Sequence, residues 1–397
     1  MSFQASDTRK GDSKLMGQIN QALILNLLRN GNGLSRTQIA RKIKLSKATV
    51  SRVVNGLIED KIVSVIGEGE SKKTGGRHPV ILSTNSSGRF VVGVDLGTTN
   101  IVVGIANLKG EIIKKIRVPT DCGHSVEKVI LQISNLVEEV IKQANIKKNL
   151  IEGIGIAEAG IVDSSSGIIK YSPNFNWKNV NITSILEKKT GLRVFADNCT
   201  RVMAIGEIWH GKRESVNNIF YVNVGYGIGS ALMINGKLHN KHSEFGHIPI
   251  TSKKILCNCG KYGCLEAVAS GNAIERKANQ LYNDSKNRWI TAKDVAERAE
   301  QGDPVAQKIF KEAGYYIGKG LSFVENVFNP DKIIIGGGIS AAGKLLLDPI
   351  IESYNNFTMA IMKSTTKIEL STIGMDAGIY GAVTMVLNKR IFYTSLL

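Results

Sequence analysis

The stretch HIPITSKKILCNCGKYGCLE, residues 247 to 266, decides how the fold is interpreted, because it brings one imidazole and three thiols within reach of a single metal ion. Cys257, Cys259 and Cys264 follow C-x-C-x4-C spacing, and two glycines let the backbone point all three thiols at one position. One His and three Cys leave no ligand position for a catalytic water, so we expect a structural Zn2+ bound by His247 and these cysteines. The alternative is that they are ordinary reduced thiols.

Length and composition favour a cytoplasmic protein of two or three domains. A chain of 397 residues is too long for one compact core, and a hydrophobic content of 43% is ample for several. No apolar run approaches the roughly 18 residues of a membrane span, and the N-terminal MSFQASDTRKGDSKL lacks the apolar core of a signal peptide. Cys122 and Cys199 stand apart, which agrees with a reducing compartment. We therefore expect a cytoplasmic location and no membrane partner.

The positive charge is concentrated near the N-terminus. The net charge is +17, from 51 basic and 34 acidic side chains. Residues 1 to 83 hold 14 Lys and Arg against 6 Asp and Glu, so about half of the excess lies in about a fifth of the chain. We expect this segment to be the contact for nucleic acid.

The N-terminal segment also has the apolar spacing of three short helices. In the first, the predicted apolar face comprises Ile19, Leu23 and Leu27, with Ile24 and Leu28 beside them. The second begins at Ser35, where Gln38 completes a capping box, and carries Ile39 and Ile43 inward.

Ser46 is expected to cap the third helix, which has the features of a recognition helix. Its apolar residues repeat at helical spacing, and short hydroxyl and basic side chains occupy the other face, as in a helix-turn-helix that contacts base edges in the major groove. The apolar set is Val50, Val53, Val54, Leu57 and Ile58, and the polar set is Lys47, Thr49, Ser51 and Arg52.

Two strand-like pieces, IVSVIGEG and HPVILS, follow and are joined by a loop that ends in Lys72-Lys73-Thr74-Gly75-Gly76-Arg77. A hairpin with a basic, glycine-rich tip is typical of a wing that contacts phosphates or the minor groove. The alternative is a polar three-helix module with a solvated loop that never binds DNA. The DNA contacts we predict are Arg36, Ser46, Lys47, Thr49, Ser51, Arg52, Gly75, Gly76 and Arg77.

From Ser86 the chain changes to apolar strands separated by glycine turns. RFVVGVDLGTTNIVVGIANLKGEIIKKIRV predicts three strands with tight turns between them, and NIFYVNVGYGIGSALMINGKLHN repeats the design. Between the copies, apolar spacing predicts a long amphipathic helix over residues 126 to 141, and IEGIGIAEAGIV predicts a buried strand. Alternating helices and strands imply an α/β fold of two duplicated lobes, with the ligand between them.

Several motifs together resemble the ROK family, which contains bacterial sugar kinases and sugar-responsive repressors of the NagC, Mlc and XylR type. Besides residues 247 to 266 they are E-F-G-H at Glu244 to His247, D-x-G-T at Asp95 to Thr99, Pro173-Asn174, G-x-G-x-G at Gly225 to Gly229, and G-G-G at Gly336 to Gly338. The helix-turn-helix and the G-G-R-x-P segment, Gly75 to Pro79, resemble the repressor branch, because the kinases lack them.

This resemblance implies an α/β chain in which an N-terminal winged helix-turn-helix precedes a two-lobed actin-like, hexokinase-like (ribonuclease H-like) domain. We place the DNA-binding domain at residues 1–84, lobe 1 at 85–196 and lobe 2, with the zinc site and an oligomerisation surface, at 197–376; a helix at about 377–397 returns to lobe 1. The resemblance also implies a sugar bound by Asn174, Asn198, Glu244, His247 and Glu266. Carboxylates and amides suit paired sugar hydroxyls, although Glu244 and Glu266 as plain surface carboxylates are the alternative.

Departures from the kinase pattern favour a regulator. In the kinases of the family the segment matching DNCTRVMAIGE has an Asp after the Asn, and that Asp is the base for the sugar hydroxyl; here Cys199 follows Asn198. A neutral thiol is a poor base, and Asp197 would serve only if the register slipped by two residues. Thr98 and Tyr226 also replace small residues in the turns expected to approach phosphates.

We therefore expect a sugar-responsive transcriptional repressor of carbohydrate-use genes, of the kind that controls xylose metabolism, rather than an enzyme. Its partners would be operator DNA and a small sugar or sugar derivative, and it would form a homodimer or a tetramer, because operators are symmetric. The alternatives are an ATP-dependent ROK sugar kinase that kept a DNA-binding head, and an adaptor whose sensing domain binds another protein.

Overall fold

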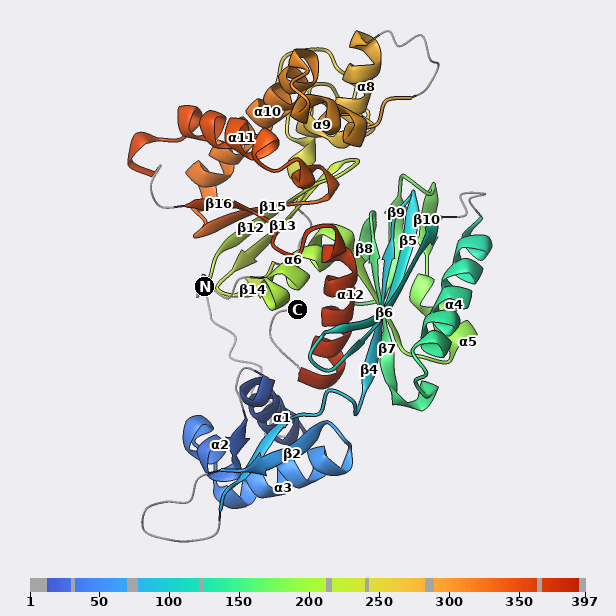
Figure 1. Cartoon of the computed structure of the whole chain (residues 1–397), viewed down its shortest axis with the longest axis vertical. Helices are drawn as coiled ribbons and strands as arrows, with labels where there is room; N and C mark the ends of the chain where they lie inside the picture. Colours follow the sequence, from blue (N-terminus) through green and yellow to red (C-terminus); the bar gives the residue numbers. More distant parts are fainter. Residues whose placement is uncertain are drawn as a thin grey trace, which may run out of the picture.

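The computed structural model describes residues 13–29, 33–69, 78–120, 125–211, 216–239, 243–282, 289–362 and 366–392. Three bodies follow one another along the longest axis: a small helical head, and two α/β lobes that each contain a five-stranded sheet (Figure 1). Two helices lie between the lobes. Within the described residues, no helix has the length and apolar composition to cross a bilayer.

The head is a winged helix-turn-helix. Its helices are α1 (Ser13–Arg29), α2 (Arg36–Ile43) and α3 (Lys47–Glu59), and its sheet has the order β1-β3-β2. Both predicted caps are present: Ser35 and Gln38 form a capping box on α2, and the Ser46 side chain accepts a hydrogen bond from the Thr49 amide of α3. The strands are β1 (Leu34–Ser35), β2 (Val63–Glu68) and β3 (Val80–Thr84).

The predicted inner face of α1 is wrong in part. Ile24 and Leu28 are buried as expected, and Leu25 is buried with them, but Ile19 is 43% exposed and Leu23 is 44% exposed. The buried face is rotated because α1 packs against the far end of the chain as well as against α3.

Lobe 1 is built on a sheet of order β11-β7-β4-β5-β6, in which β4, β5 and β6 are antiparallel and β7 and β11 are parallel to β4. Helices α4 and α5 cover one face and α12 covers the other (Figure 1). The elements are β4 (Phe90–Leu96), β5 (Asn100–Asn107), β6 (Ile112–Pro119), α4 (Val126–Gln143), β7 (Ile151–Glu158), α5 (Ile182–Thr190) and β11 (Val194–Asn198), with a small antiparallel sheet of β8 (Ile161–Asp163), β9 (Ile168–Ser172) and β10 (Trp177–Val180).

Lobe 2 repeats this topology. Its sheet has the order β14-β13-β12-β15-β16, again with three antiparallel strands and two strands parallel to the first. This match in strand order and direction supports the internal duplication predicted from the two hairpin segments. The elements are β12 (Ile219–Val224), β13 (Ile228–Ile234), β14 (Lys237–Leu238), α7 (Leu265–Ala269), α8 (Gly271–Leu281), α9 (Ala292–Glu300), α10 (Pro304–Phe328), β15 (Lys332–Gly336), α11 (Lys344–Phe357) and β16 (Lys367–Leu370).

Helices α6 (Cys199–His210) and α12 (Ala377–Leu387) form the layer between the two sheets. Helix α12 packs on β4 and β7 of lobe 1, while α6 contributes apolar residues to the core under the lobe 2 sheet. The two helices also pack closely on each other: a Cβ at Gly381 would lie 1.9 Å from the carbonyl oxygen of Val202. The chain continues from α12 into the π-helical turn η6 (Asn388–Phe392).

Candidate functional site

The His/Cys cluster predicted from spacing is assembled in the structure. One ligand atom from each of His247, Cys257, Cys259 and Cys264 lies within 4.8 Å of the others. The Sγ atoms of Cys259 and Cys264 are 3.6 Å apart, and the Sγ of Cys257 is 3.6 Å from Nδ1 of His247. These separations suit a tetrahedral site, because Zn–S bonds of about 2.3 Å place two thiolates about 3.8 Å apart.

The loop that carries the cysteines is shaped by its backbone. Gly260 and Gly263 have φ values of +84° and +72°. This left-handed backbone conformation is unfavourable for residues that carry a Cβ atom, so glycine is suited to both positions. The amide of Cys257 donates to the carbonyl of Lys261, and the amide of Gly260 donates to the carbonyl of Cys257. This turn keeps Cys257 and Cys259 close to Cys264, which lies just before α7, and the four side chains could hold a metal ion.

Three of the five predicted sugar ligands adjoin this cluster. Nε2 of His247, the ring nitrogen that faces away from Cys257, lies 3.9 Å from a carboxylate oxygen of Glu244, whose side chain is 58% exposed. Glu266 is engaged differently, because its Oε2 accepts a hydrogen bond from the amide of Ile228 at 2.9 Å. One carboxylate oxygen of Glu266 therefore links α7, which follows the cysteines, to the Gly225–Gly229 turn. Only the other oxygen remains available to a sugar hydroxyl, whereas both were expected to be.

Asn198 and Asn174 are held by lobe 1, because β11 of the lobe 1 sheet runs to Asn198, two residues past the predicted boundary between the lobes. Asn198 ends β11 and caps α6: its side-chain oxygen accepts from the amides of Thr200 and Arg201, and its Nδ2 donates to the carbonyl of Gly160. The adjacent Thr200 lies against Gly229 of lobe 2, so Asn198 is brought close to the turn that Glu266 binds. Asn174 is exposed in the turn after β9.

The position expected for a kinase base is occupied by an unreactive thiol. Cys199 is the first residue of α6, and burial, followed by the nearby charges of Asp95 and Glu158, raises the pKa of its thiol to about 12. A thiol with this pKa stays protonated at neutral pH and accepts no proton from a sugar hydroxyl.

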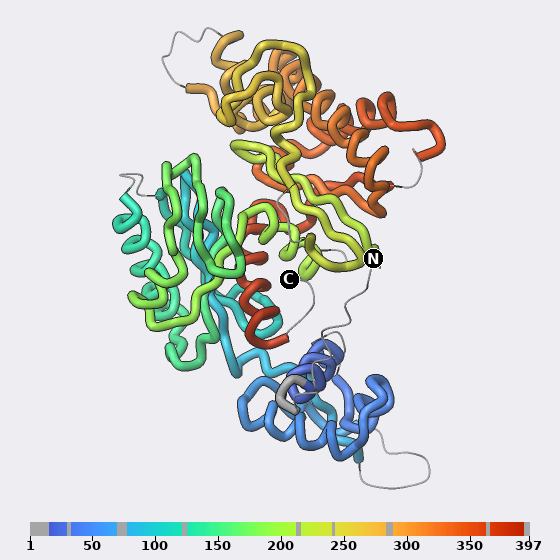
Figure 2. The backbone as a smooth tube through the Cα atoms, turned by 180° about the vertical axis from the view of Figure 1, so that it is seen from behind, coloured from blue at the N-terminus to red at the C-terminus, as the bar shows by residue number. Residues whose placement is uncertain are grey.

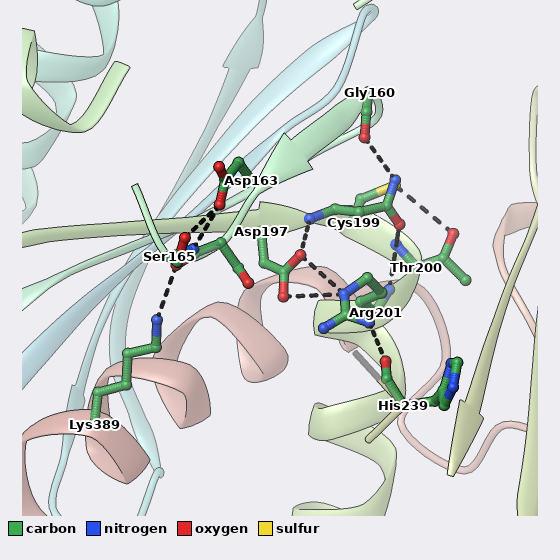
Figure 3. A network of polar contacts seen from close by, with 11 residues as sticks. Gly160, Asp163, Ser165, Asp197, Cys199, Thr200, Arg201, His239 and Lys389 are labelled. Carbon is green, nitrogen blue, oxygen red and sulfur yellow. Dashed lines mark hydrogen bonds and ion pairs between the residues drawn. The ribbon is translucent and has the colours of Figure 1, made fainter. Parts of the chain in front are cut away.

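Asp197 does not replace it. Its carboxylate is 2% exposed and receives hydrogen bonds from Nε of Arg201 at 3.0 and 3.1 Å, while the same guanidinium reaches the carbonyl of His239 (Figure 3). Asp197 and Asn198 are neighbours on a strand and so point to opposite faces of the sheet. The carboxylate of Asp197 is therefore bound by Arg201 and points away from the face that carries the side chain of Asn198.

The predicted DNA-contacting face is on the surface of the head. Lys47 and Arg52 are exposed on α3, Thr49 and Ser51 are half-buried, and Nη2 of Arg36 donates to the side-chain oxygen of Asn55 at 2.9 Å, which ties α2 to α3. The predicted wing residues Gly75, Gly76 and Arg77 lie outside the described residues.

Sequence reasoning missed several residues of the site and its surroundings. Glu158 is fully buried at the end of β7, where a carboxyl group inside the apolar segment IEGIGIAEAGIV was a signal that could have been used. The contact between Arg29 at the end of α1 and Trp209 on α6 joins the head to the two-lobed domain. No sequence signal pointed to it, because the two residues are far apart in the chain and meet only in the folded protein.

The fold and the cluster define a class: a duplicated two-lobed α/β domain with a His/Cys cluster, preceded by a winged-helix head. A model of the ROK family matches residues 91–389, and a model of the MarR family matches residues 18–73. The chain belongs to the ROK family, and the predicted winged helix-turn-helix followed by a two-lobed α/β domain is confirmed.

The relatives include regulators and kinases. The xylose repressor of Caldicellulosiruptor bescii is 33% identical over 396 residues, covering 96% of this chain and 99% of its own. The glucokinase of Thermotoga maritima is 33% identical over 314 residues, covering 75% of this chain and 98% of its own. A solved ROK family transcriptional regulator, a homologue of the E. coli MLC protein, superposes with a TM-score of 0.81 at 25% identity and covers 96% of this chain and 99% of its own.

Proposed function

We propose that the protein is a sugar-responsive transcriptional repressor that binds operator DNA through its winged helix and releases it when a sugar binds the ROK domain. The observation that carries the proposal is the pairing of a winged-helix head with a ROK domain in which Cys199 stands at the position expected for the kinase base. Relatives that share the head are named xylose repressors, so xylose is the first effector to test. A DNA-binding role places the protein in the cytoplasm.

The metal in this proposal is a structural Zn2+ held by His247, Cys257, Cys259 and Cys264. The thiol-rich set fits zinc, because soft thiolates and an imidazole in a closed tetrahedral arrangement are its usual structural ligands. The ion would fix the ring of His247 through Nδ1 and leave Nε2, beside Glu244, to contact a sugar hydroxyl. Asn198 and Asn174 would contact the sugar from lobe 1.

The repressor would act as a dimer, because two recognition helices must meet a symmetric operator. We place the dimer surface on α10, the end of α11 and the segment that follows α11, where several large apolar side chains are exposed. The rings of Tyr315 and Phe357 meet edge to face with centroids 5.8 Å apart, and the amide of Met359 donates to the side-chain oxygen of Asn326. The exposed set is Tyr315, Phe323, Val327, Phe357, Met359 and Ile361.

The test begins with a thermal-shift screen of zinc-loaded protein against pentoses, hexoses and polyols, since a ligand raises the melting temperature according to its concentration over its Kd. Operator DNA is then selected from a random library, and its affinity is measured with and without the stabilising sugar. We expect sugar to weaken operator binding roughly tenfold to a hundredfold, within the usual range of coupling between sites. An operator affinity that is the same at saturating sugar would contradict the proposal.

The kinase alternative is tested in parallel. We expect no sugar phosphate above background when the protein is incubated with ATP, Mg2+ and the stabilising sugar, because neither Cys199 nor Asp197 can accept the proton. A ROK glucokinase assayed under the same conditions is the positive control. Steady turnover of ATP with formation of sugar phosphate would establish the enzyme instead.

A further inference from the structure

The head and the ROK domain share one hydrophobic core. Ile24, Leu25 and Leu28 of α1 belong to the same buried cluster as Leu387, Ile391 and Phe392 at the end of the chain. Nδ2 of Asn26 donates to the carbonyl of Phe392 at 3.2 Å. Both views place α1 next to the end of α12 (Figure 1, Figure 2). The head is therefore packed on the ROK domain as well as connected to it by the chain.

Arg29, the last residue of α1, lies over an aromatic pair of the ROK domain. Its Cζ is 3.5 Å from the ring centroid of Trp209 and 5.6 Å from that of Phe392. The two rings meet edge to face at 5.4 Å, and Trp209 is 6% exposed. A guanidinium over a largely desolvated indole is a favourable and directional contact, so this joint fixes the orientation of α1.

Trp209 is carried by α6, the helix whose other end is capped by Asn198. Asn198 is a proposed sugar ligand, and its side chain binds two amides of the first turn of α6 and the carbonyl of Gly160. Helix α6 thus has a proposed sugar ligand, Asn198, at its N-terminus, and near its C-terminus it carries Trp209, the residue that the head contacts. Helices transmit small displacements from end to end because their backbone hydrogen bonds resist bending and stretching.

Helix α6 is also placed to respond to the relative position of the lobes. Arg201 pairs with Asp197 of lobe 1 and donates to the carbonyl of His239 of lobe 2 (Figure 3). The close contact between Gly381 and Val202 joins α6 to α12, and α12 runs into η6, which carries Phe392. Both rings under Arg29 therefore belong to the block formed by α6 and α12.

We propose that the block of α6 and α12 carries the sugar signal to the head, and that the contact of Arg29 with Trp209 and Phe392 is the joint through which it acts. The inference rests on the proposed function, because it concerns the sugar site and the operator site of that function. Sugar bound by Asn198 and by lobe 2 changes the position of lobe 2 relative to lobe 1. Helix α6, which contacts both lobes, shifts against α12, and the surface on which α1 packs changes with it. The joint contacts neither sugar nor base edges, so Arg29 and Trp209 are positioning residues.

The experiment measures operator affinity with and without the stabilising sugar for Arg29→Met and Trp209→Leu in the full-length, zinc-loaded protein. Two variants elsewhere serve as matched controls: Arg298→Met removes a guanidinium that lies 4.5 Å over Tyr282 in lobe 2, and Trp289→Leu removes a tryptophan that is 58% exposed. Sugar affinity without DNA is measured for every variant by calorimetry. Arg29→Lys, which keeps the charge and loses the planar stack, is the second variant should Trp209→Leu fail to fold.

We expect the sugar-dependent change in operator affinity to fall from the wild-type factor to about twofold or less in Arg29→Met and Trp209→Leu, while sugar affinity stays within about twofold of wild type. The controls should keep the wild-type factor. Hydrogen exchange over residues 13–29 without DNA should change on sugar addition in the wild type and not in Arg29→Met.

If both joint variants keep the full sugar response while wild-type protein responds, the inference is overturned and the proposed function stands. If wild-type protein shows no sugar response with the sugar that stabilises it, the proposed function fails and the inference fails with it. A loss of response caused only by loss of sugar binding would also overturn the inference, because the joint would then support the sugar site itself.

Discussion

At the carboxyl edge of the lobe 1 sheet, Glu158 is a carboxylic acid without exposed surface. Its Oε1 accepts a hydrogen bond from Oγ of Ser172 at 2.5 Å, and the amide of Gly160 faces it. Ser172 is two residues before Asn174, and the carbonyl of Gly160 accepts a hydrogen bond from the side-chain Nδ2 of Asn198. One buried side chain thus supports both sugar ligands that we assign to lobe 1.

Burial raises the pKa of Glu158 to about 7, against the hydrogen bond from Ser172, which lowers it. An acid whose pKa is higher in the folded state binds more protons folded than unfolded, so its effect on folding free energy becomes less favourable as pH rises from about 4.5 to 7 and is constant above. Burial also raises the pKa of Asp95, to about 6, so Asp95 changes the folding free energy with pH in the same direction.

Glu158→Gln, which keeps an acceptor for Ser172, should therefore unfold at a higher temperature than wild type at pH 8, and the advantage should shrink toward pH 5. A rise in the pKa of Glu158 from 4.5 to about 7 corresponds to a free energy of roughly 3 kcal/mol. Melting curves of both proteins across this range, with zinc present, provide the measurement; taking the difference between them cancels the contributions of Asp95 and the metal ligands. Parallel pH profiles for the two proteins would contradict the assignment.

At the scale of the elements, the loop that carries Cys257, Cys259 and Cys264 allows a direct test of the proposed zinc site. Cys257→Ser should lower zinc from about one ion per chain toward zero and lower the melting temperature, because the free energy of metal binding contributes to folding. Cys199→Ser, a thiol outside the cluster, should keep its zinc. Metal analysis of unchelated protein checks both, and a wild-type preparation without zinc would exclude the metal.

A second prediction at this scale concerns helix α3, the proposed recognition helix. Arg52 is exposed on the polar face of α3, and Ser46 caps the N-terminus of this helix, which is the end that we propose contacts the bases. Arg52→Ala should reduce discrimination between operator and random DNA by about 1 to 3 kcal/mol, because a base contact is lost while most phosphate contacts remain. Lys61→Ala, a basic residue just beyond α3, should weaken both DNAs alike or not at all. An equal loss on both DNAs for Arg52→Ala would show that Arg52 contacts the backbone.

Features set by neighbouring residues could be predicted from the sequence, and features set by distant ones could not. The caps at Ser35 and Ser46, the glycine turns between strands and the cysteine spacing are local, and the structure bears them out. The buried face of α1 was predicted incorrectly because part of its partner surface comes from residues near 390. The bond from Glu266 to Ile228 and the stacking of Arg29 on Trp209 depend on how the lobes and the head pack.

At the scale of the whole molecule, the coupling that we propose between sugar and operator must be reciprocal. If sugar weakens operator binding by a given factor, operator must weaken sugar binding by the same factor, because both describe one coupling free energy. A nearly complete switch requires about 5.5 kcal/mol of preference between the two arrangements, whereas typical couplings are about 1 to 3 kcal/mol. Partial release, sharpened by sugar binding to both protomers, is the expected behaviour.

Glu244→Ala tests this linkage. The Glu244 side chain is exposed and lies beside Nε2 of His247, whereas Glu266 also accepts a hydrogen bond from the backbone of the Gly225–Gly229 turn and so has a structural role. The variant should bind sugar at least tenfold more weakly, since a carboxylate that accepts sugar hydroxyls is lost, and should bind operator as wild type does when sugar is absent. Glu297→Ala, an exposed carboxylate on α9, should change neither. Calorimetric titration of sugar into wild-type protein, with and without saturating operator, gives one factor, and titration of operator with and without sugar gives the other. The two factors should agree within error, and a clear inequality would mean that sugar and operator act on different populations of the protein.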